Sequence, residues 1–150
     1  MEEIIFYKMH GLGNDFVIIP DVKCDLYENE ITRLSNRNHG IGCDQLILTQ
    51  MSRFNQDLRM LVYNSDGTKA EACGNAMRCI GLLQKILYDR AIINIAIGGK
   101  NYLTQVLSST NNTGIVEVVI PEYQVKKLNI QFNSSYYAYS VNIGNSHLIF

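Results

Sequence analysis

The chain has 150 residues, of which 47% are hydrophobic and 18% are charged, and its formal net charge is −1 at pH 7. This size and balance predict a folded domain rather than a disordered segment. The nearly neutral charge and the lack of a basic stripe argue against nucleic acid and anionic membranes as partners. No apolar run is long enough for a membrane span, and the acidic start, Met1-Glu2-Glu3, is unlike a signal peptide. A cytoplasmic protein is therefore predicted.

The first half of the chain predicts short strands and one short helix. Strands are expected at 4–7, 17–20, 45–49 and 59–63, and a helix at 28–38. The strongest helix prediction covers 74–90, where the apolar residues have the i, i+3, i+4, i+7 spacing of one helical face. These residues are Ala76, Cys79, Ile80, Leu83, Ile86 and Leu87.

The second half predicts strands at 91–97, 102–107 and 115–120, joined by turns at Gly98-Gly99 and 111–114. Residues 121–135 lack periodicity and are interpreted as a linker, followed by a strand at 136–143, a loop at 144–147 and an apolar strand that stops at Phe150. We therefore expect a first domain over 1–120, and a linker with the start of a truncated second domain over 121–150. One long helix among many short strands predicts an α+β fold with a mainly antiparallel sheet.

Cys73 lies where a polar loop becomes the long predicted helix. The first N–H groups of a helix and the positive end of its dipole favour an anion, so they would favour a thiolate or hold a substrate carboxylate. A single cysteine near a helix start is more often a small buried hydrophobe. The neighbouring Gly67, Gly74 and Asn75 are poor core residues, and this favours the functional interpretation.

The other cysteines, Cys24, Cys43 and Cys79, are interpreted as structural. No signal peptide accompanies the four cysteines, so reduced thiols are expected rather than disulfides. Their spacing does not match a zinc site, and no metal is predicted.

Four segments resemble those of the diaminopimelate epimerase family, in order and in spacing. They are Lys8–Phe16 (KMHGLGNDF), Arg37–Gln45 (RNHGIGCDQ), Asn64–Cys79 (NSDGTKAEACGNAMRC) and Gly144–His147 (GNSH). The resemblance implies two similar α/β domains, each with a sheet wrapped around a central helix, and an active site in the cleft between them. The family is usually longer, so this chain resembles its N-terminal half.

The resemblance implies cofactor-independent epimerisation of LL-diaminopimelate to meso-diaminopimelate, a step in the biosynthesis of lysine and peptidoglycan precursors. Two cysteines act on opposite faces of the α-carbon: a thiolate removes the proton and a thiol returns one. Cys73 matches the first cysteine, and the second would lie beyond Phe150, so residues 1–150 alone are expected to be inactive. The substrate is a small amino acid, and a homodimer is left open.

The resemblance also assigns binding residues. Gly74 and Asn75 match contacts to the substrate carboxylate. Asn14, Gln45, Asn64 and Asn145 match other substrate-binding positions, and His147 matches a histidine implicated in catalysis. Taken alone, each polar residue has a simpler explanation: Asn14 and Asn64 as turn residues, Gln45 as a solvated side chain and His147 as a loop histidine. A related racemase for another amino acid and a non-catalytic fragment are the alternative functions.

Overall fold

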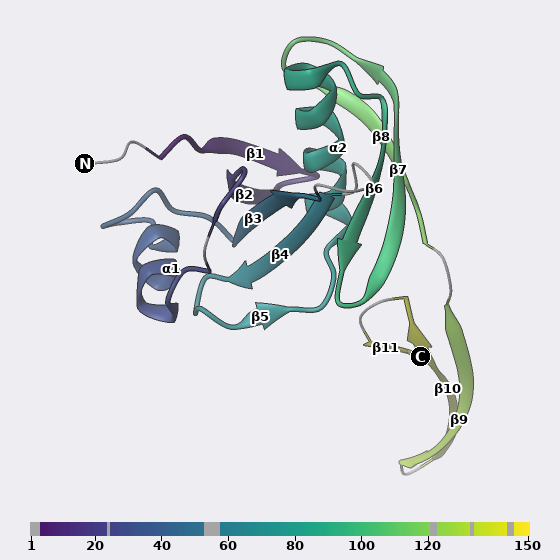
Figure 1. The fold of residues 1–150 in the computed structure, drawn as a ribbon. Coiled ribbons are helices and arrows are strands. Elements are labelled where there is room, and N and C mark those ends of the chain that lie inside the picture. Colours follow the sequence, from purple (N-terminus) through teal and green to yellow (C-terminus); the bar gives the residue numbers. More distant parts are fainter. Residues whose placement is uncertain (1–3, 24, 53–57, 121–122, 133, 144–145) are drawn as a thin grey trace. The chain divides into compact units, whose positions relative to one another are not determined.

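The computed structural model of this chain describes residues 4–23, 25–52, 58–120, 123–132, 134–143 and 146–150 (Figure 1). The chain divides into two compact units, Met1–Val119 and Ile120–Phe150, which are described separately. Among the described residues, neither helix has both the length and the apolar character needed to cross a bilayer.

The first unit is a mixed sheet with two helices. Its elements are β1 (Tyr7–Gly11), β2 (Asn14–Ile19), α1 (Glu28–Ser35), β3 (Gln45–Met51), β4 (Leu58–Asn64), β5 (Lys69–Ala70), α2 (Gly74–Tyr88), β6 (Ile92–Ile97), β7 (Lys100–Ser109) and β8 (Gly114–Val119). The sheet order is β1-β2-β3-β4-β6-β7-β8, with β5 paired to β4. Only the β2–β3 and β4–β6 pairs are parallel. The predicted α+β fold with a mainly antiparallel sheet is confirmed.

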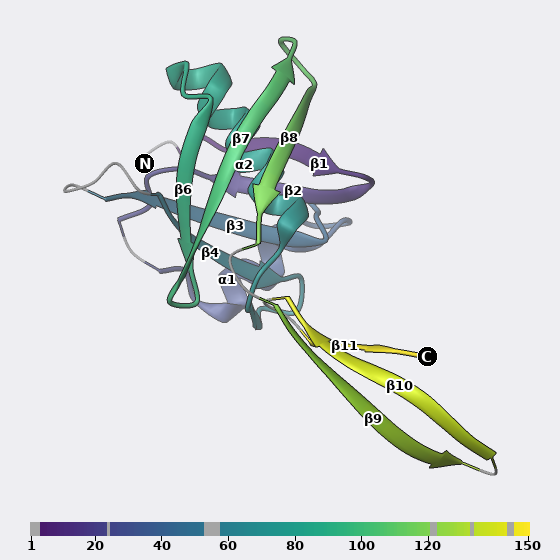
Figure 2. The ribbon, with the colours of Figure 1, turned by 90° about the vertical axis from the view of Figure 1, so that its right-hand side faces the viewer.

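The sheet curves around α2, which contacts β1 at one end of the strand order and β7 and β8 at the other (Figures 1 and 2). The predicted face is buried at Ala76, Cys79, Ile80 and Leu83, but Ile86 and Leu87 in the last turns are half exposed. Residues outside that face, including Met77 and Leu82, are buried as well. A helix buried on several sides is a central helix rather than a surface one.

Strand β2 is covered on both faces. In β2, Phe16 and Ile18 pack with α2, whereas Val17 and Ile19 pack in a second cluster with Ile31 of α1. This alternation follows from the two-residue period of a strand, and burial on both faces explains the continuous apolar run Phe16–Ile19.

Several boundaries differ from the sequence prediction, among them the strand predicted at 17–20, which begins at Asn14, and the loop predicted at 144–147, of which Ser146 and His147 belong to a strand. Two of the differences have a clear reason. The first strand covers Tyr7–Gly11 instead of 4–7, because it is defined by its pairing with Asn14–Ile18 of β2. Helix α1 ends at Ser35 instead of 38, because the side-chain oxygen of Asn36 accepts the N–H groups of Asn38 and His39 and turns the chain.

The second unit contains β9 (Gln124–Phe132), β10 (Ser134–Asn142) and β11 (Ser146–Ile149), paired antiparallel in the order β11-β10-β9. The prediction of an aperiodic linker over 121–135 is therefore wrong for 124–132. Val125, Tyr137 and Tyr139 are exposed in this ribbon. Pairing with β10 defines β9; its first residues, 124–127, have no hydrophobic alternation, whereas Leu128, Ile130 and Phe132 alternate with polar residues in the sequence.

Candidate functional site

Three of the predicted site residues meet at one edge of the first unit's sheet. Asn14 is the first residue of β2, Gln45 is the first residue of β3, and Asn64 is the last residue of β4. Strands β2 and β3 are parallel and β4 is antiparallel to β3, so these ends coincide; Gln45 lies directly opposite Asn64. The topology therefore collects three amide side chains that are far apart in the sequence.

The start of α2 is brought to the same edge by close packing against Gly11. A Cβ atom on Gly11 would lie 3.1 Å from the carbonyl oxygen of Asn75 and 3.2 Å from its Cβ, which is tighter than ordinary van der Waals contact. The turn that follows has positive φ at Leu12 (54°) and Gly13 (88°) and leads directly into Asn14. Glycine at position 11 thus allows the β1–β2 hairpin to lie against the helix start.

Cys73 is the N-cap residue of α2 and is half buried. The N–H of Ala76 donates to its sulfur at 3.5 Å. Its thiol donates to Oδ1 of Asn14 at 3.7 Å. Gly74 and Asn75 are the first two helical residues, and their N–H groups have no acceptor within the helix. The sulfur therefore lies between an amide side chain and two N–H groups that can receive an anion.

Gln45 and Asn64 belong to a second chain of hydrogen bonds. The Gln45 side-chain amide donates to Oδ1 of Asn64 at 3.0 Å, and the Asn64 amide donates to the Thr68 hydroxyl at 3.0 Å. Thr68 in turn donates to Asp66. Oδ1 of Asn64 and Nε2 of Gln45 are thereby occupied, whereas Oε1 of Gln45 is buried without a partner among the described residues.

An ion cluster is formed by charged side chains that are connected to Asn14 through hydrogen bonds: Lys8, Asp15, Arg37 and Asp44. Asp15 accepts from Lys8 at 2.6 Å and from Arg37 at 2.6 and 3.1 Å. Arg37 also bonds Asp44 at 2.8 Å, and Lys8 donates to the carbonyl of Gly42. Hydrogen bonds from Arg37, the largest cause, together with Lys8 hold the pKa of Asp15 well below its usual range. The same pairing raises the pKa of Arg37.

We expect Asp15→Asn to lower the free energy of unfolding at pH 7 by about 1–2 kcal/mol, through weaker bonds to Arg37 and Lys8. A carboxyl whose pKa is lowered by folding stabilises the protein above its unfolded pKa, about 3.9, and this stabilisation is lost as the pH falls below that value. The difference between wild type and variant should therefore shrink between pH 5 and pH 3. Urea unfolding at several pH values measures it.

The control for this variant is Asp25→Asn. Asp25 lies 3.9 Å from Lys69, and both side chains are more than half exposed, so its loss should have little effect. An equal loss of stability for Asp15→Asn at pH 7 and pH 3 would contradict the role of the ion cluster.

The other described cysteines differ from Cys73. Cys79 is buried, and desolvation, the largest cause, raises its pKa to about 11, so its thiol stays protonated. Cys43 is also buried, and its thiol donates to the Ser35 hydroxyl at 3.5 Å. Cys24 lies outside the described residues.

We expect mild alkylation of the folded protein at neutral pH to label Cys73 before Cys43 and Cys79. Only Cys73 among these three is partly exposed, so the reagent reaches its sulfur more easily than the buried ones. Peptide mapping by mass spectrometry at low reagent excess measures the order of labelling. Earlier labelling of Cys43 would count against the site.

The remaining predicted residues belong to the second unit. His147 is an exposed residue of β11, paired with Val141 of β10, and Asn145 lies outside the described residues. Their roles in a site with Cys73 stay predictions.

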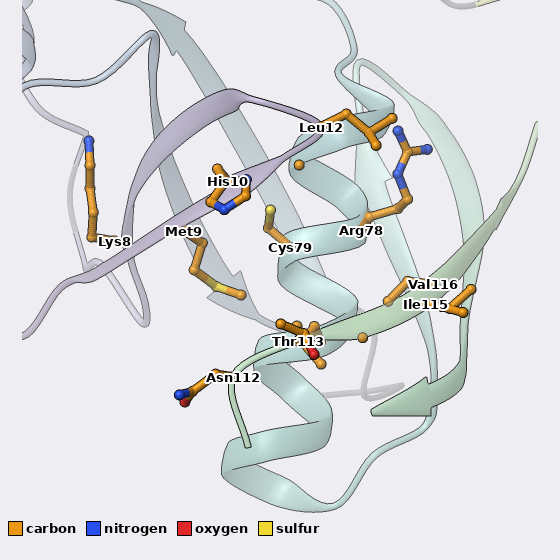
Figure 3. A pocket seen from close by; sticks show the side chains of 13 residues that line it. Lys8, Met9, His10, Leu12, Arg78, Cys79, Asn112, Thr113, Ile115 and Val116 are labelled. Carbon is orange, nitrogen blue, oxygen red and sulfur yellow. The ribbon is translucent and has the colours of Figure 1, made fainter. Parts of the chain in front are cut away.

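A cavity of about 480 Å³ lies beside α2 (Figure 3). Its lining comes from β1, α2, β8 and the turn before β8, and includes His10, Leu12, Arg78, Cys79 and Ile115. None of the predicted site residues lines it. It lies where the two ends of the curved sheet approach α2, and Gly11, which packs against the start of α2, also lines it.

The sequence analysis assigned no role to Asp15, Arg37 or Asp44, although the structure connects all three to Asn14. A signal was present: two of the segments with a family resemblance place Asp15 directly after Asn14 and Asp44 directly before Gln45. Pairing of β2 with β3 turns these sequence neighbours into contacts.

Comparison with known proteins gives a consistent result. Residues 6–120 match the family model of diaminopimelate epimerase. The diaminopimelate epimerase of Sphingopyxis alaskensis is 35% identical over 161 residues, which cover 97% of this chain and 56% of that protein. That of Buchnera aphidicola is 35% identical over 166 residues, which cover 98% and 57%. The chain thus spans slightly more than half the length of these relatives.

Solved structures share the fold. A predicted epimerase from Pseudomonas aeruginosa has a TM-score of 0.73 at 9% identity, covering 96% of this chain and 57% of that one. A probable proline racemase from Agrobacterium radiobacter has a TM-score of 0.72 at 9% identity, covering 97% and 51%. The predicted epimerase-like fold is confirmed.

Proposed function

This chain belongs to the diaminopimelate epimerase family, and we propose that its Cys73 site acts in the cofactor-independent epimerisation of LL-diaminopimelate to meso-diaminopimelate. The observation that carries the proposal is the position of the Cys73 sulfur, at the start of α2 and within hydrogen-bond distance of both Ala76 and Asn14. This position supports a proton-transfer role for Cys73 beside N–H groups that could bind an anion.

The carboxylate of the substrate would bind the N–H groups of Gly74 and Asn75. Gly74 suits this role because a Cβ at that position would meet only the Arg78 side chain, at 3.8 Å, so the backbone is open to a ligand. A bound carboxylate would place the α-carbon near the sulfur. Negative charge develops at the α-carbon as the α-proton is removed, and the same N–H donors would stabilise this charge.

The sheet edge that carries the amide side chains of Asn14, Gln45 and Asn64 would hold the polar groups of the substrate. The buried Oε1 of Gln45 is an unused acceptor that suits an ammonium group. Asn64 is bonded to the same side chain, and Asn14 begins the neighbouring strand. We also include Asn145 and His147, on the resemblance of their segment to the family.

The reaction balances as an exchange of protons. Cys73 as a thiolate removes the α-proton and becomes a thiol, while a thiol on the opposite face gives its proton to the carbon. In the reverse direction Cys73 is the donor. One base on one face cannot invert the centre, so we propose that residues 1–150 alone do not epimerise diaminopimelate. We further propose that the protein is cytoplasmic, because free thiols persist in that compartment.

The test is an assay of the intact protein with LL-diaminopimelate, alongside proline, hydroxyproline and histidine, in deuterated water. We expect meso-diaminopimelate with deuterium at the α-carbon and no inversion of the other amino acids. Inversion of another amino acid in preference would instead support a related racemase. No inversion of any of them would reject the proposal.

A further inference from the structure

Asp44 is the residue that connects the ion cluster to the Asn14 amide. Its Oδ2 accepts from Nδ2 of Asn14 at 3.1 Å and from the backbone N–H of Asp15 at 3.0 Å. Its Oδ1 accepts from Arg37 at 2.8 Å, and its own N–H donates to Asp15. Both carboxylate oxygens are thus occupied, and the carboxylate is held in one position.

This carboxylate determines the orientation of the Asn14 amide. An ionised carboxylate only accepts hydrogen bonds, so the NH₂ group of Asn14 must face Asp44. The carbonyl Oδ1 then faces the sulfur of Cys73, at 3.7 Å. An acceptor in that place can bond a thiol but repels a thiolate, whereas the Ala76 N–H on the other side can bond either form.

We propose that Asp44 is a positioning residue: it sets which atom of the Asn14 amide faces the Cys73 sulfur and thereby favours the protonated, proton-donating form of Cys73. The inference rests on the proposed function in that Cys73 must exist in both forms during turnover. Asp44 itself touches neither the sulfur nor, in this scheme, the substrate.

Other ionisable groups near Cys73 lie on several elements, and Glu71, two residues before Cys73 in the sequence, is exposed. On α2, Arg78 bonds the Asn75 side chain, and Cys79 is neutral over the accessible pH range because of its raised pKa. On β1, which packs against α2, Lys8 is bonded to Asp15 and His10 lines the cavity beside Cys79. On β2, Asp15 is held by Arg37 and Lys8.

The test is the pH dependence of Cys73 alkylation by iodoacetamide between pH 6 and pH 9, read by peptide mapping, in wild type and Asp44→Asn. Without the carboxylate the Asn14 amide is free to turn, and its NH₂ group can bond the thiolate. We expect the pH midpoint to move to lower pH and the rate at pH 7 to rise about three- to tenfold, as one amide hydrogen bond would give.

Asp44→Asn also removes a negative charge, which by itself would favour the thiolate. The Asn14→Ala background separates the two causes. Asn14→Ala alone should lower the midpoint, because the thiol loses its acceptor, and this variant tests the inference even if Asp44→Asn does not fold. Adding Asp44→Asn to Asn14→Ala should then give only the smaller shift that the lost negative charge causes.

The matched control is Asp66→Asn, which removes a carboxylate bonded only to Thr68 among the described residues. It should leave the profile unchanged. The inference is overturned if Asp44→Asn does not move the midpoint, if it raises the rate equally at all pH values, as simple loosening would, or if its shift is equally large without Asn14. Alkylation needs no turnover, so an inactive protein would reject the proposed function and leave this result standing.

Discussion

Replacement of Cys73 by alanine is expected to reduce epimerisation by the intact protein by about 10³-fold or more, since the variant has no group to transfer a proton on that face. The melting temperature should hardly change, because Cys73 is only half buried and its hydrogen bonds at 3.5 and 3.7 Å are long. Formation of meso-diaminopimelate and deuterium incorporation at the α-carbon measure the loss.

Cys43→Ala is the control for this experiment. It deletes the same sulfur from a buried position without an assigned role, so most of the activity should remain. Epimerisation by Cys73→Ala at nearly the wild-type rate would reject the two-thiol mechanism, provided that both variants are folded.

Gly81→Leu is expected to lower the free energy of unfolding by about 3 kcal/mol or more. Gly81 is buried within α2, and a Cβ there would lie 2.6 Å from Cγ2 of Thr104 on β7 and 3.0 Å from Cγ1 of Val116 on β8. Both neighbours are β-branched and have little freedom to move away. The helix would have to separate from the sheet, and urea unfolding measures the cost.

Gly81→Ala should cost less, because the single methyl group is partly offset by the higher helix propensity of alanine, about 1 kcal/mol. Lys85→Leu adds the same leucine to the same helix at a more exposed position and should be nearly neutral, apart from the lost pair with Asp89. Equal stability of Gly81→Leu and wild type would show that α2 does not pack closely on β7 and β8.

The sequence was a good guide to elements whose burial produces a pattern. The spacing from Ala76 to Leu83 located α2, but the burial of Met77 and Leu82 depends on strands on several sides, which a single helical pattern does not reveal. The exposure of Ile86 and Leu87 has the same origin, since the sheet does not cover the last turns. In the second unit, β9 was missed because it is formed by backbone pairing.

For the candidate site, motifs identified the residues but not their connections. Cys73 and Asn14 are 59 positions apart, and their contact depends on the Gly11 hairpin packing against α2. Asp44 was missed because its effect on Cys73 passes through Asn14. That relation exists only after β2 and β3 pair in parallel, with Phe16 opposite Gln45.

The enclosure of α2 by the sheet has a consequence for motion at the site. Local opening is easiest where few apolar contacts hold an element, and an element packed on several sides opens mainly when the whole unit unfolds. Gly81 in the middle of α2 allows this close packing, and Cys73 is attached to the start of the same helix. The sulfur is thus attached to a helix whose amide hydrogens we expect to exchange slowly, and its position relative to Asn14 should therefore persist in time.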